Sequence, residues 1–188
     1  MTALAHLIIE AEKGPLSSEC VDRGIISFLS FIEWVEQLPY GRNSDRSEYR
    51  LVFDEEKGAC STKNALVKAV ATENGWDNVK LYLGVFMMSE KTHPQLKNIL
   101  NKNELKAIPE VHTYLKINDE IRDVTGLETG SVSFEELVEI EVEIKPDQIG
   151  DYKENWHKSQ MIAFSFENGR SPNDLWDIRE ACILELSK

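Results

Sequence analysis

Cys60, His112 and Asp123 are the residues of this chain whose types could together support nucleophilic chemistry. A cysteine thiolate can attack a carbonyl carbon, an imidazole can move the protons that the reaction requires, and a carboxylate can orient the imidazole. The reaction would be acyl transfer through a thioester. It requires the fold to bring together three side chains that lie far apart in the sequence.

Cys60 lies at the start of a predicted helix that spans residues 60–73 and ends at Asn74-Gly75. The free N–H groups and the dipole at a helix N-terminus favour an anion, which lowers the pKa of a thiol and enriches the thiolate. Gly58 allows a close approach of the chain and leaves space for a substrate. Taken alone, a cysteine near a helix start is usually a packing residue, and Cys20 and Cys182, on apolar stripes, fit that description.

His112 and Asp123 fall on the two strands of a predicted hairpin, in residues 111–117 and 121–124. A two-residue turn at residues 118–119 pairs Tyr114 with Asp123 and His112 with Thr125. All four side chains then share one face, because side chains alternate along a strand. His112 and Asp123 become diagonal neighbours, about 7 Å apart at the backbone, so their side chains can form a hydrogen bond. A shift of one residue in the pairing would separate them.

The elements around these residues follow from hydrophobic periodicity and from Gly and Pro signals. Helices are predicted at residues 19–37, 60–73 and 147–164, and a last one starts at Ser171-Pro172. Strands are predicted at residues 79–88 and 138–144, besides the two of the hairpin. This order predicts an α+β fold in which N- and C-terminal helices cover an antiparallel sheet.

Length, composition and charge restrict the class of protein. The chain has 188 residues, is 41% hydrophobic and carries a net charge of −12, which indicates one globular domain over residues 1–188 and argues against nucleic-acid binding. No segment is long and apolar enough to span a membrane, and the N-terminus does not resemble a signal peptide. Three widely spaced cysteines suggest neither disulfides nor a zinc site, so we expect a cytoplasmic protein without a metal or other cofactor.

Separate motifs around the three residues resemble one known family. Residues 56–66 contain Gly58-Ala59-Cys60 at a helix start, residues 78–86 form a strand with Gly and an aromatic residue, residues 110–116 contain a His-x-Tyr motif, and residues 122–125 contain Asp-x-Thr. The order Cys, His, Asp and the type of element that carries each one are similar to the transglutaminase-like branch of the papain-type cysteine enzymes. The resemblance covers residues 51–125, and residues 126–188 match no catalytic motif.

The resemblance implies a papain-like core in which a Cys-bearing helix packs on an antiparallel sheet that carries His and Asp. It also implies that Cys60 is the nucleophile, His112 the base and then the acid, and Asp123 the residue that orients His112. The backbone N–H of Cys60 is one expected oxyanion donor; Tyr40 and Asn43 are candidates for the other. Members of the family often carry an aromatic residue soon after the nucleophile. This chain departs from that pattern, because it has Ser61-Thr62-Lys63 there.

The expected function is hydrolysis, or transamidation, of an amide or peptide bond through a Cys60 thioester. The substrate would be a peptide, a protein or a small amide, and the oligomeric state stays open. The alternative is a catalytically inert transglutaminase-like binding module. A Cys/His metal site is a poor third reading, because Cys60 and His112 supply too few ligands.

Overall fold

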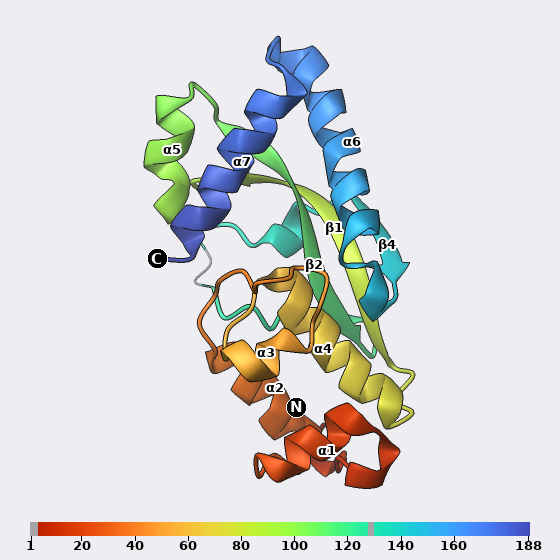
Figure 1. Cartoon of the computed structure of the whole chain (residues 1–188). Coiled ribbons are helices and arrows are strands. Elements are labelled where there is room, and N and C mark those ends of the chain that lie inside the picture. Colours follow the sequence, from red (N-terminus) through yellow and green to blue (C-terminus); the bar gives the residue numbers. More distant parts are fainter. Residues whose placement is uncertain (1–3, 128–129) are drawn as a thin grey trace.

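The computed structural model describes residues 4–127 and 130–188. Within them the chain forms seven α-helices, five short 3-10 helices and one antiparallel sheet of four strands, which confirms the predicted α+β class. Figure 1 shows helices α1 to α4 around one end of the two long strands and helices α5 to α7 around the other end. The 3-10 helices are Leu4–His6, Ala11–Lys13, Pro94–Leu96, Phe134–Glu136 and Pro146–Gln148.

The sheet has the strand order β3-β2-β1-β4, with the two long strands in its centre. Its strands are β1 (Val79–Ser89), β2 (Ala107–Ile117), β3 (Glu120–Arg122) and β4 (Ile140–Ile144). The hairpin of β2 and β3 has the predicted register over its paired residues, because Ile117 pairs with Glu120 across a turn whose two residues both have positive φ, 54° and 65°. The strand predicted at residues 121–124 ends earlier, at Arg122, so Asp123 and Thr125 follow β3 and the predicted pairs with Tyr114 and His112 are not part of the ladder. The strand predicted at residues 111–117 begins earlier, at Ala107. β4 begins later than predicted; it is an edge strand, and Ile140 is 55% exposed.

Four helices lie at the N-terminal end of the molecule, namely α1 (Pro15–Asp22), α2 (Phe28–Gln37), α3 (Leu51–Glu55) and α4 (Cys60–Glu73). The single helix predicted at residues 19–37 is therefore wrong, because two helices occupy this stretch. Gly24 adopts a φ of 77°, and the N–H of Ile25 bonds to the Cys20 carbonyl, which closes α1. Helix α4 matches its predicted bounds.

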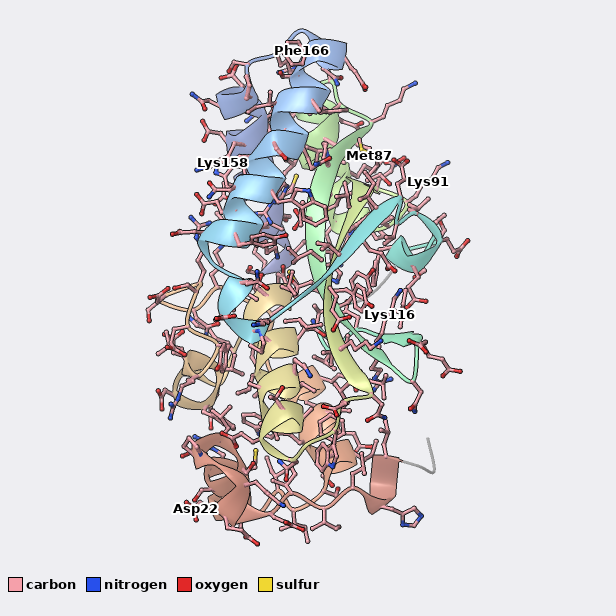
Figure 2. The ribbon with its side chains drawn as sticks, turned by 90° about the vertical axis from the view of Figure 1, so that its right-hand side faces the viewer. Asp22, Met87, Lys91, Lys116, Lys158 and Phe166 are labelled. Atoms are coloured by element: carbon pink, nitrogen blue, oxygen red, sulfur yellow. The ribbon has the colours of Figure 1, made fainter. Side chains whose placement is uncertain are left out.

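Three helices surround the other end, namely α5 (Lys97–Lys102), α6 (Asp151–Asn168) and α7 (Pro172–Leu186). Helix α7 begins as predicted, since the Ser171 hydroxyl accepts a hydrogen bond from the N–H of Asp174 and proline occupies the first helical position. Helix α6 begins later than predicted, because residues Pro146–Gln148 form a 3-10 turn instead. Figure 2 shows Lys158 on α6 and Phe166 near its C-terminal end; Phe166 is exposed.

The apolar side chains form two core clusters, and each takes residues from both long strands. The first joins α1, α2 and α4 to β1 and β2, and it includes Val111, Leu115 and Ile117 of the hairpin. The second joins α5 and α7 to the same two strands and includes Tyr114 and Phe134. Among the described residues no helix is long and apolar enough to cross a membrane.

Candidate active site

The segment before Cys60 is held so that the thiol lies at the first position of α4. Gly58 pairs with the chain at Tyr40, its N–H donates to the Pro39 carbonyl, and the Gly41 N–H donates to the Gly58 carbonyl. A Cβ on Gly58 would come within 2.8 Å of the Lys63 side chain, so glycine permits this close approach. The Thr62 hydroxyl accepts the Ala59 N–H at 3.2 Å and thereby caps the helix start.

The Cys60 thiol is in an environment that favours its ionised form. Burial alone would raise its pKa, but the positive charges of Lys153 and His112 outweigh burial and lower the pKa to about 5. The side chain is 4% exposed. The other two thiols differ, because burial raises the pKa of Cys20 to about 12 and that of Cys182 to about 11. Cys60 is therefore the thiol with nucleophilic character at neutral pH.

His112 and Asp123 form the hydrogen bond that the hairpin register predicts. The His112 Nε2 lies 2.8 Å from the Asp123 Oδ2, which leaves Nδ1 as the imidazole nitrogen available to the thiol. Burial would lower the pKa of His112, but the charges of Asp123 and Cys60 and the hydrogen bond to Asp123 raise it to about 10. His112 thus contacts the Asp123 carboxylate directly, whereas among the described residues the hydrogen-bond contacts of the Cys60 sulfur are with Lys153 and Ser61 and not with His112.

Asp123 is fixed by hydrogen bonds from Asn64 and Thr125. Its Oδ1 accepts hydrogen bonds from the Asn64 amide and the Thr125 N–H, both at 3.1 Å, and its Oδ2 accepts one from the Thr125 hydroxyl at 2.9 Å. These bonds and the charge of His112 lower its pKa despite burial, which acts in the opposite direction. Asn64 lies one turn after Cys60 and also donates to the Cys60 carbonyl, so one side chain links the helix to Asp123.

Lys63, a buried lysine, also links α4 to the segment that carries Asp123. Its Nζ donates to the Leu38 carbonyl at 2.6 Å and to the Thr125 carbonyl at 2.7 Å. It therefore ties α4 to the end of α2 and to the segment that carries Asp123. Asn64 and Lys63 follow Cys60 in the printed sequence, but nothing in their spacing indicates that they reach the hairpin.

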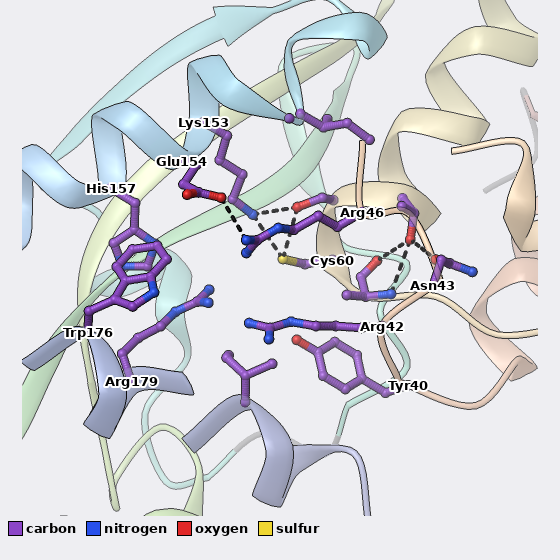
Figure 3. A pocket seen from close by; sticks show the side chains of 16 residues that line it. Tyr40, Arg42, Asn43, Arg46, Cys60, Lys153, Glu154, His157, Trp176 and Arg179 are labelled. Carbon is purple, nitrogen blue, oxygen red and sulfur yellow. Dashed lines mark hydrogen bonds and ion pairs between the residues drawn. The ribbon is translucent and has the colours of Figure 1, made fainter. Parts of the chain in front are cut away.

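Lys153 of α6 is the residue near the thiol that the sequence analysis missed. Its Nζ lies 3.3 Å from the Cys60 Sγ and also donates to the Ser61 hydroxyl at 2.6 Å and the Thr113 hydroxyl at 2.9 Å. Figure 3 shows its side chain directed at the sulfur. Lys153 lies in the segment that matches no catalytic motif, and no sequence signal identifies it.

Cys60 lines a pocket between the start of α4 and the two C-terminal helices. The lining includes Tyr40, Arg42, Arg46, Cys60, Ser61, Lys153, Glu154, His157, Trp176 and Arg179 (Figure 3). Its three arginines are held by carboxylates: Arg42 by Glu180, Arg46 by Glu154 at 2.8 Å, and Arg179 by Glu110. Lys153 lies beside the Cys60 sulfur on the wall of this pocket.

Tyr40 and Asn43, the two candidate oxyanion donors, differ in what their side chains contact. Both lie on the wall of the pocket, but the amide of Asn43 donates to the Glu55 carboxylate at 3.1 Å and to the Lys57 carbonyl at 3.0 Å. Its Oδ1 accepts from the Thr62 hydroxyl, so Asn43 holds the loop before α4. Burial raises the pKa of the Tyr40 hydroxyl, and the negative charge of Cys60 raises it further, so this hydroxyl stays protonated.

No family model, curated protein or solved structure matches this chain. The resemblance to transglutaminase-like proteins therefore rests on the motif residues quoted above. Among the described residues, no three His, Cys, Asp or Glu side chains lie close enough to hold a metal ion.

Proposed function

We propose that this protein is a cysteine-dependent acyl-transfer enzyme that hydrolyses an amide or ester bond through a Cys60 thioester. In this proposal α4 and the sheet correspond to the core of papain-like enzymes, and Cys60, His112 and Asp123 act as a triad. The observation that carries it is that a helix-start thiol of lowered pKa and the 2.8 Å His112–Asp123 hydrogen bond are linked by Asn64, which donates both to the Cys60 carbonyl and to Asp123. Neither feature alone indicates catalysis, but together they provide a nucleophile, a proton carrier and its orienting group.

The first half of the reaction forms the thioester. The Cys60 thiolate attacks the carbonyl carbon, a C–S bond forms, and the carbonyl electron pair moves to the oxygen. The free N–H groups in the first turn of α4 would stabilise this oxyanion. The oxyanion then collapses, the bond to the leaving group breaks, and the His112 imidazolium gives its proton to the leaving amine or alcohol.

The second half releases the acyl group. His112 is now neutral, and Asp123 keeps its Nε2 engaged so that Nδ1 can accept a proton. A water molecule loses a proton to His112 and adds to the thioester carbonyl. The C–S bond then breaks, which yields a carboxylic acid and restores the thiolate beside imidazolium. Water is the default acceptor; an amine in its place would give transamidation.

A specific observation also favours the alternative, a binding module that does not turn over. Cys60 is only 4% exposed, and Lys153 contacts its sulfur at 3.3 Å. A site closed in this way would bind a ligand in the pocket beside Lys153 without acylation of the thiol. The two functions differ in whether Cys60 accepts an acyl group.

The test is acylation by a small activated ester, p-nitrophenyl acetate, followed by the burst of nitrophenol and by intact mass. We expect one acetyl group on Cys60 and its loss by hydrolysis. Cys60→Ser should abolish the burst, and His112→Gln should slow it by about 10²- to 10⁴-fold. Cys182→Ser is the matched control, because this thiol is fully buried on α7 and has a raised pKa. An enzyme that acquires no acetyl group, or acquires it elsewhere than Cys60, contradicts the proposal.

A further inference from the structure

Lys153 is held beside the thiol by contacts from two different elements. The ammonium donates to the Ser61 hydroxyl of α4 and to the Thr113 hydroxyl of β2, besides its contact with the Cys60 sulfur. The residue is 6% exposed. A lysine with three fixed contacts has lost most of its rotational freedom, so its charge stays at one place relative to the sulfur.

The ammonium of Lys153 has no carboxylate contact among the described residues. Its neighbour Glu154 instead pairs with Arg46 at 2.8 Å and with Lys158 at 2.7 Å. Burial of an ammonium is costly unless it has a counter-charge. The Cys60 sulfur contacts the ammonium at 3.3 Å, and in its ionised form this sulfur would supply the counter-charge.

The position also fits the charge that develops during attack. When a carbonyl carbon bonds to the sulfur, negative charge leaves the sulfur and gathers on an oxygen two bonds away. Oxyanion donors lie about 2.7–3.1 Å from that oxygen, and Lys153 starts 3.3 Å from the sulfur, at the same helix end as the free N–H groups. The ammonium can therefore contact the thiolate before attack and the oxyanion after attack with little movement.

We propose that Lys153 is a catalytic residue, the second oxyanion donor of the Cys60 site, and that it holds the thiolate before attack. This inference rests on the proposed acyl-transfer function. It also gives Lys153 the role of second oxyanion donor, for which Tyr40 and Asn43 were the candidates from the sequence. The amide of Asn43 is engaged in its own loop, and Lys153 has the direct contact with the reacting sulfur.

The experiment compares Lys153→Met with wild type by two rates. Alkylation of Cys60 by iodoacetamide across pH reports ionisation of the thiol, and its midpoint should rise by about one to three pH units when the cation is lost. Acylation by p-nitrophenyl acetate is then measured at pH values where the thiol of the variant is fully ionised. We expect this limiting rate to stay about 10²- to 10³-fold below wild type, because an oxyanion donor is absent at every pH.

The matched control is Lys158→Met on the same helix. Lys158 is exposed, pairs with Glu154 and points away from the sheet (Figure 2), so both rates should equal those of wild type. Where Lys153→Met fails to fold, Lys153→Gln, which keeps a hydrogen-bonding partner for Ser61 and Thr113, is judged by the same two rates.

The outcomes separate the two proposals. A limiting acylation rate that returns to the wild-type value at high pH overturns the oxyanion role, since Lys153 would then only lower the thiol pKa. An unchanged alkylation midpoint and an unchanged acylation rate overturn both roles of Lys153. If wild-type protein forms no acyl-enzyme at all, the proposed function fails, and the assignment of Lys153 fails with it.

Discussion

The chemistry at the residue scale depends on which of the three thiols is ionised. The pKa of Cys60 is lowered by the charges of Lys153 and His112, whereas Cys20 and Cys182 lie in the two apolar core clusters. Cys60 is therefore the thiol that ionises most readily, and the other two pack in the core. This difference in environment leads to a direct test.

Limiting iodoacetamide should modify Cys60 before Cys20 and Cys182. Only the thiolate reacts, and the pKa of Cys60 is lowered to about 5 while the pKa values of the other two are raised. The rate at Cys60 should stay nearly constant from pH 8 down to about 6. Peptide mass mapping identifies the modified residue. Preferential modification of Cys20 or Cys182 in folded protein would contradict the assignment.

Asp123→Asn should reduce acylation more than it reduces stability. The amide can offer only one oxygen where the carboxylate accepts hydrogen bonds on two, and it does not stabilise imidazolium by charge. We expect a loss of about 10²- to 10⁴-fold in the acylation rate, with a melting temperature within a few degrees of wild type. The control is Asp119→Asn in the hairpin turn, where φ is 65° and asparagine is tolerated. Wild-type acylation by Asp123→Asn would remove Asp123 from the triad.

At the scale of elements, the site is a junction of α4, β2 and α6, with α7 behind it. Helix α4 brings the thiol, β2 brings His112, and α6 brings Lys153. Helix α7 is fixed to β2 by a buried ion pair, in which Arg179 donates to the Glu110 carboxylate at 2.7 and 2.8 Å. Both residues are almost completely buried, so this pair holds the wall of the pocket in place.

Arg179→Met should destabilise the protein by about 3–5 kcal/mol, because it leaves the Glu110 carboxylate buried without its partner. Loss of both charges, in Glu110→Gln with Arg179→Met, should recover a large part of that stability. Arg46→Met removes an exposed ion pair and serves as the control, with an expected change below about 1 kcal/mol. Urea denaturation measures all four proteins. An equal loss in the single and the double variant would show that the ion pair is not what holds α7.

At the scale of the whole molecule, the pKa values of Cys60 and His112 differ between the folded and unfolded states, so stability depends on pH. The pKa of Cys60 falls from 9.0 to about 5 on folding, and that of His112 rises from 6.5 to about 10. The thiolate contributes stability above pH 9 that is lost as pH falls through 5. The imidazolium contributes stability below pH 6.5 that is lost as pH rises through 10. Between 6.5 and 9 the two slopes cancel, since the folded and unfolded states hold the same number of protons.

The prediction compares wild type with the double variant Cys60→Ser, His112→Gln. The difference between their free energies of unfolding, wild type minus variant, should be constant from about pH 6.5 to 9. It should decline below pH 6.5 and again above pH 9. Chemical denaturation at several pH values between 4.5 and 10.5 gives this difference. A difference that rises or falls steadily across neutral pH would contradict a thiolate–imidazolium pair in the folded state.

The sequence by itself determined the local parts of this site. The Asn118-Asp119 turn pairs Ile117 with Glu120 as predicted, and Asp123, just after β3, forms the expected hydrogen bond with His112. The helix that starts at Cys60 has its predicted bounds. Both depend on residues close together in the chain, whose side-chain direction follows from a period of two or 3.6 residues. The α+β class followed from the order of such segments.

Only the tertiary structure decided what surrounds the sulfur. The sequence predicted the helix that carries Lys153 but not the element against which this helix packs. The contact of Lys153 with Cys60 joins residues 93 positions apart. The position of Asn43 also depends on contacts outside its own segment, with the Glu55 carboxylate and the Thr62 hydroxyl. Periodicity shows which face of an element is buried; it does not show against which other element that face packs. The electrostatics of a thiol depend on that second fact, because charges act across space and not along the chain.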